Sequence, residues 1–150
     1  MGTEERGHDM NRAQRRAWKR KAEATGAKLA SRCYDFQDGA IVPVADPRAI
    51  GALARAFTLL LRNGGQSLAV PLSEAEADGF PTCARNRPQG AVTWLAVGMD
   101  AEGRASYALH SAVSEARDMA HDAARSLALS RLAETCATRG FPMTPVRGRA

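Results

Sequence analysis

The chain has 150 residues, of which 45% are hydrophobic, and its formal net charge is +5. This length suits a single globular domain with a modest core, and three widely separated cysteines, Cys33, Cys83 and Cys136, argue against a disulfide scaffold. Because no apolar run approaches the roughly 18 residues of a membrane span and the first residues lack the apolar core of a secretory signal, we expect a cytoplasmic protein.

Positive charge is concentrated near the N-terminus. Residues 1–10 have mixed charge and no apolar periodicity, which predicts a disordered leader. Residues 12–32 contain eight basic residues and one acid, whereas residues 33–146 contain ten basic and twelve acidic residues. This asymmetry is typical of a basic arm on a nearly neutral body and indicates an anionic partner. We predict a basic helical arm over residues 11–32, followed by a domain at 33–141.

The predicted helix of the arm begins at Asn11, which is a suitable N-cap, and contains good helix formers. At about 100° per residue, five basic side chains fall on one arc, and an apolar seam lies about a third of a turn away. We expect the seam to dock the helix on the body, while Gly26 weakens the helical pattern beyond it. The basic arc consists of Arg12, Arg15, Arg16, Lys19 and Arg20. The seam consists of Trp18, Ala22 and Leu29.

A second helix is marked by its end signals. Residues 39–45 are β-branched and contain Pro43, which predicts an edge strand. Asp46 as N-cap, a proline at the first helical position and the glycines at 64–65 then delimit a helix with one apolar face. Opposite that face, three arginines recur every seven residues and form a second possible basic seam, unless they are simply a solvated helix back. These are Arg48, Arg55 and Arg62.

The second half of the chain predicts most of the sheet. Residues 67–72 suit a strand, Ser73 and Glu76 form a capping box, and residues 80–90 are expected to be a loop. Residues 91–98 and 104–110 are the best hairpin candidate.

We expect a long helix from Ser111 to Thr138, in which the apolar face changes side along its length. Either its own domain contacts the helix on two sides, or its last part meets a partner or a second copy through Leu129, Leu132 and Cys136. Residues 142–150 are expected to be a flexible basic tail. Together these elements predict an α+β fold with a small antiparallel-rich sheet of three or four strands, two main helices and the appended basic helix.

The basic arc is the leading functional candidate, because Arg and Lys at helical spacing can follow a phosphate backbone. We predict a non-enzymatic accessory protein that binds DNA or RNA through the arc, with Trp18 available to stack on a base. The segment from Asn11 to Arg20 resembles the basic starts of small accessory proteins of phages and plasmids.

The alternative is a protein–protein interaction module, an adaptor or inhibitor that uses the basic helix and the second face of the last helix, with a homodimer also open. No cofactor or metal is implied, since the common nucleotide, nucleophile and zinc motifs do not occur. A pocket that joined His110 to Cys83 or to a carboxylate would favour an enzyme.

Overall fold

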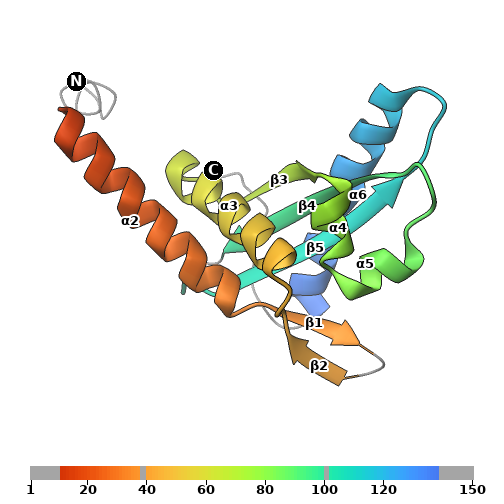
Figure 1. Cartoon of the computed structure of the whole chain (residues 1–150), viewed down its shortest axis with the longest axis horizontal. Helices are drawn as coiled ribbons and strands as arrows, with labels where there is room; N and C mark the ends of the chain where they lie inside the picture. The colour runs from red at the N-terminus through yellow and green to blue at the C-terminus, as the bar shows by residue number, and fades with distance from the viewer. Residues whose placement is uncertain (1–10, 38–39, 100–101, 139–150) are drawn as a thin grey trace.

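A three-stranded antiparallel sheet forms the centre of the computed structural model, which describes residues 11–37, 40–99 and 102–138 (Figure 1). The sheet has the order β3-β4-β5. Its strands are β3 (Ser67–Leu72), β4 (Val92–Met99) and β5 (Ala105–Ala112). Helix α3 (Pro47–Asn63) covers one face of the sheet and α6 (Arg117–Thr138) covers the other. The predicted α+β class, with two main helices and an appended N-terminal helix, is confirmed.

The two faces of the sheet follow from the alternation of side chains along β4. Leu95 and Val97 are fully buried with the core residues of α3, whereas Ala96 between them is buried with residues of α6. On α3 the buried side chains recur at helical spacing and include Leu53 and Phe57. Asp46 caps this helix through its Oδ1, and its C-cap Gly64 has φ 71°, so the predicted end signals are confirmed.

Helix α6 lies on the sheet through a row of small side chains. The row is buried and recurs every four residues: Ala120, Ala124, Ala128, Leu132 and Cys136. Three alanines let the helix axis approach the strands closely. The indole of Trp94 on β4 completes this layer, because its Nε1 donates a hydrogen bond to His121 Nδ1 at 2.9 Å.

The N-terminal helix α2 (Arg12–Ser31) packs along α3 (Figure 1). Its buried residues are Ala22, Gly26, Leu29 and Ala30. A Cβ at Gly26 would lie 2.4 Å from Thr58 Oγ1 and 2.9 Å from the Ala54 carbonyl oxygen, so only glycine allows this approach. The helix continues through Gly26 to Ser31, contrary to the prediction, and Gly26 sets its contact with α3.

Several element boundaries differ from the prediction. The strand expected at 39–45 is β2 (Ala40–Pro43), which pairs with β1 (Tyr34–Gln37) in a separate two-stranded sheet. The capping box of α4 (Glu74–Asp78) is confirmed, but the expected loop at 80–90 contains α5 (Pro81–Asn86), which begins at a proline.

The helix expected from Ser111 begins only at Arg117, because Ser111 and Ala112 continue β5 and pair with β4. The predicted leader, residues 1–10, and the predicted tail, residues 142–150, lie outside the described residues. Among the described helices, none is long and apolar enough to cross a membrane.

Candidate functional site

The N-terminal half of α2 projects past the end of α3 and away from the sheet (Figure 1). Every residue from 11 to 21 is exposed, and the first buried residue of the helix is Ala22. This half carries six cations and no acid: Arg12, Arg15, Arg16, Lys19, Arg20 and Lys21. All five residues of the predicted basic arc are therefore exposed. We call residues 11–21 the basic arm from here on.

The charges of the basic arm oppose the stability of their own helix. The first turn contains no acidic residue, although the helix dipole favours negative side chains there. Arg12 and Arg16, like Arg16 and Arg20, stand four residues apart, where like charges each cost about 0.2–0.5 kcal/mol. A capping box between Asn11 and Gln14 partly offsets this cost. The arm thus holds repelling cations that an external polyanion would stabilise.

The predicted docking seam is correct for two of its three residues. Ala22 and Leu29 are buried against the body, but Trp18 is 45% exposed. Trp18 precedes Ala22 by one helical turn and belongs to the exposed residues 11–21. Its indole is therefore partly accessible to a ligand of the basic arm.

The second basic seam on α3 stays a prediction, but two of its three arginines form ion pairs with neighbouring carboxylates. Arg48 Nη2 donates to Asp46 Oδ2 at 2.9 Å. The hydrogen bonds from the side chain and the backbone of Arg48 lower the pKa of Asp46 to about 2. Arg55 Nη1 donates to Glu76 Oε2. Burial alone would raise the pKa of Glu76, but the bonds from Arg55 and the α4 cap bring it below its ordinary value. Arg62 is exposed at the end of the helix.

The predicted partner face of the last helix is also corrected. Leu132 is 1% exposed and Cys136 is fully buried, and both pack with Ala96 and Ala108 of the sheet. Leu129 is partly buried against the same cluster. Leu132 and Cys136 belong to the single buried row of α6 that recurs every four residues, so these side chains are core residues and do not face a partner.

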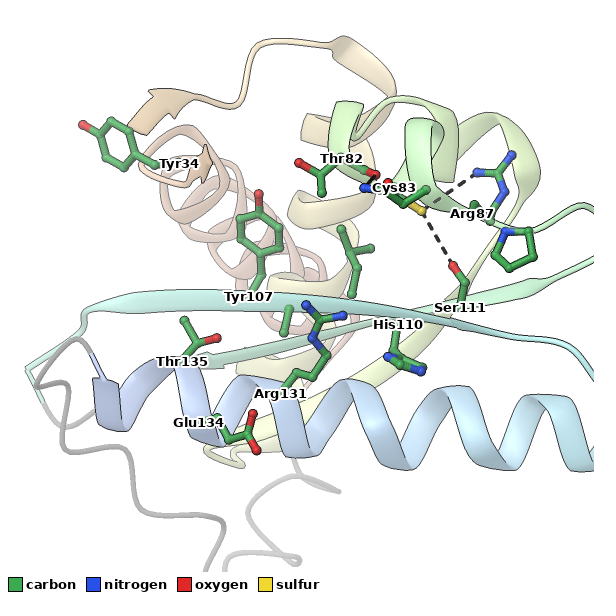
Figure 2. Close-up of a pocket in the computed structure, with 14 residues that line it drawn as sticks. Tyr34, Thr82, Cys83, Arg87, Tyr107, His110, Ser111, Arg131, Glu134 and Thr135 are labelled. Carbon is green, nitrogen blue, oxygen red and sulfur yellow. Dashed lines mark hydrogen bonds between the residues drawn. The ribbon is translucent and has the colours of Figure 1, made fainter. Parts of the chain in front are cut away.

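A groove with a volume of about 770 Å³ runs along β5 (Figure 2). One wall comes from α5 and β1, and the other comes from the C-terminal half of α6. The floor is the segment from Tyr107 to Ser111 on β5. We call this feature the β5 groove.

A chain of polar contacts fixes the α5 wall of the groove. Arg87 Nη2 donates to Asp78 Oδ1 at 2.6 Å, and its Nη1 lies 4.0 Å from Cys83 Sγ. Cys83 Sγ lies 3.8 Å from Ser111 Oγ, which shares a 2.7 Å hydrogen bond with Thr93 Oγ1. Cys83 is 9% exposed. These contacts hold the Cys83 thiol in place on the α5 side of the sheet.

The α6 wall carries a different chemistry. His110 projects from β5 toward α6, on the side opposite Ser111 and Cys83 (Figure 2). His110 and Cys83 therefore both line the groove, but they lie on opposite sides of β5 and are not paired as base and nucleophile. The Nδ1 atom of His110 is buried and has no hydrogen-bond partner among the described residues. Burial, followed by the positive charge of Arg131, lowers the pKa of His110 below its ordinary value of 6.5.

Replacing Arg131 with glutamine should raise the pKa of His110, because one source of the depression is removed. A depressed histidine pKa means that the unfolded chain takes up the proton first, so the native protein loses stability as the pH falls below 6.5. The variant should lose less stability over this range. An NMR titration measures the pKa of His110 in each protein. Urea unfolding at about pH 7.5 and pH 5.5 measures the loss of stability. An unchanged pKa in the variant, with Arg117→Gln as control, contradicts the assigned influence of Arg131.

The β5 groove was missed by the sequence analysis because its residues come from four separate elements. His110 was considered with Cys83 or a carboxylate, but no pattern along the chain relates it to Arg131, which lies on another element. Within the described part of the chain, no group of three His, Cys, Asp or Glu residues could hold a metal ion. Burial also raises the pKa of the Cys33 thiol to about 12, so this cysteine is unreactive.

Comparison of the chain with protein-family models, with curated proteins and with solved structures finds no match.

Proposed function

We propose that the protein binds nucleic acid through the phosphate backbone, using the basic arm of α2. The observation that carries this proposal is the exposure of six cations, with no acid among them, on a helical half that projects from the body. A helix in such a position can reach a duplex without rearrangement of the core.

The spacing of the cations fits an extended polyanion better than a single small anion. From Arg12 to Arg20 the helix rises about 12 Å, at about 1.5 Å per residue. Duplex DNA carries about one charge per 1.7 Å of its axis, so several phosphates lie within reach of this length. Five of the six cations belong to the predicted arc. The arginines among them can form bidentate contacts with phosphate. A small anion would neutralise only one or two of these charges.

A salt titration tests this function directly. Binding of the full chain to a duplex of about 20 base pairs should be measured by fluorescence anisotropy from roughly 50 to 200 mM salt. If the five arc residues each neutralise one phosphate, the logarithm of the affinity should fall with a slope of about −4.5. This slope corresponds to a loss of roughly 500-fold in affinity across that range.

The titration also distinguishes the proposal from a merely solvated basic helix. A solvated helix gives a dissociation constant weaker than about 1 μM at 50 mM salt, or no salt dependence, and either result rejects nucleic-acid binding. A single strand of the same length serves as comparison. A slope closer to −3.5 is expected there, because single strands release fewer counterions for each phosphate neutralised.

A further inference from the structure

The two edges of the central sheet differ in how readily they can pair with another strand. On β3 the outer edge contains Pro71, which lacks a backbone N–H, and its carbonyl oxygen accepts a bond from Arg55 Nη2 at 3.3 Å. Proline and charged side chains at an edge prevent pairing with another strand. On the opposite edge, β5 has eight residues with no proline and no lysine. Within the described residues β5 pairs only with β4, so its outer edge has no neighbouring strand.

The unpaired edge of β5 faces the β5 groove, which opens on both sides of the strand (Figure 2). An extended segment that paired with β5 would send alternate side chains to opposite faces of the sheet. On the α5 side these side chains would meet Leu109 and the aromatic Tyr107, whose ring lies 5.6 Å from that of Phe80. On the α6 side they would meet His110 and Arg131.

On the α6 side Arg131 points toward β5, whereas Glu134 on the same wall points away from the strand (Figure 2). Arg131 is exposed in the groove and makes no ion pair within the described residues. In the part of the chain that the structure describes, the buried Nδ1 atom of His110 also has no hydrogen-bond partner. A carboxylate placed here would pair with the guanidinium of Arg131. The α5 side differs, because Arg87 is already neutralised by Asp78.

We propose that β5 is a docking edge for an extended peptide that adds a fourth strand to the sheet. The peptide alternates apolar side chains, directed to the Tyr107 side, with acidic side chains, directed to Arg131 and His110. The site is separate from the basic arm and does not depend on nucleic-acid binding.

An alternating peptide tests this site with the full chain. The probe is an acetylated peptide with four repeats of Val-Glu, and its binding is measured by isothermal titration calorimetry. Matched peptides carry Val-Lys repeats or the same residues in scrambled order. The Val-Glu peptide should bind at least about tenfold more tightly than either control. Absence of binding at a peptide concentration of about 1 mM overturns the proposal.

Backbone methylation separates strand addition from simple charge attraction. Each amide of the Val-Glu peptide is N-methylated in turn, which removes one donor without changing the net charge. In strand pairing, only every second amide of the peptide bonds to β5, so binding should be lost at alternate positions. Equal tolerance of methylation at all positions overturns the strand model, even if the peptide binds.

Two variants on one helix locate the acidic side of the site. Arg131→Glu should weaken the Val-Glu peptide by at least about tenfold, whereas Arg117→Glu should leave it unchanged, since Arg117 lies outside the groove. Far-ultraviolet circular dichroism confirms that both variants fold. Equal weakening by the two variants overturns the proposal. If sedimentation shows a dimer in which the amides of β5 are protected from hydrogen exchange and the peptide cannot compete, a second copy occupies the edge and the proposal is also overturned.

Discussion

Replacing Gly26 with leucine should lower the free energy of unfolding by about 1–3 kcal/mol and separate the basic helix from α3. Even a bare Cβ at this position would lie 2.4 Å from Thr58 Oγ1 and 2.9 Å from the backbone oxygen of Ala54. The Thr58 hydroxyl could turn away, but it already donates to the Ala54 carbonyl at 2.7 Å, and the backbone oxygen itself cannot withdraw. The helices must therefore move apart, which exposes Leu29 and Ala30.

Gly51 provides the matched control, because a Cβ added there meets no atom within 4 Å. Gly51 is exposed on α3, so Gly51→Leu should stabilise the protein by up to about 1 kcal/mol through better helix propensity. Urea unfolding of the two variants gives both free energies, and hydrogen exchange in α2 reports whether the helix has separated. Equal stabilities of the two variants would contradict the close contact of α2 with α3.

The parts of the fold that the sequence predicted are those controlled by local signals. Helix α3 was predicted with its N-cap and C-cap because Asp46 and Gly64 act on backbone groups within a few residues. The β4–β5 hairpin was predicted because its strands are adjacent in the chain, and Gly103 in the connection has φ 80°. Such signals do not depend on the rest of the structure.

The parts that the sequence did not predict depend on tertiary contacts. Ser111 is a good helix cap in isolation, but pairing with Thr93 keeps it in β5. Gly26 weakens a helix in isolation, but it allows the close packing of two helices. The apolar residues Leu132 and Cys136 suggested a second helix face, but they belong to the buried row of α6 that recurs every four residues and packs on the sheet.

The candidate site shows the same division. The basic arc could be predicted because charge is a property of composition, and its residues are adjacent in the chain. Its exposure, however, results from the position of the contact between the helices, because Gly26 in the C-terminal half of α2 meets Ala54 and Thr58 of α3. The prediction attributed the exposure instead to the direction of one helix face. Arg55 looked equivalent to the arc residues, but it is paired with Glu76, which lies 21 positions along the chain.

A variant in which all five arc residues are glutamine should bind duplex DNA at least about a hundredfold more weakly at low salt, and its salt slope should approach zero. Glutamine is a good helix former, and its introduction removes the repulsion between cations one turn apart. The helix should therefore remain folded, and the free energy of unfolding should not fall. Anisotropy titrations across salt, with urea unfolding of the same samples, measure both outcomes. The replaced residues are Arg12, Arg15, Arg16, Lys19 and Arg20.

A second five-residue variant controls for net charge, because it removes the same number of cations from the body of the protein. Its replaced residues, again changed to glutamine, are Arg62, Arg104, Arg117, Arg125 and Arg131. If binding depends on the basic arm, this control should keep a salt slope close to that of the unmodified chain, since the phosphates it contacts are unchanged. If the two variants weaken binding equally, attraction depends on total charge and the arm is not the binding site. The comparison is informative because both variants reach the same formal charge, while only one alters the projecting half of α2.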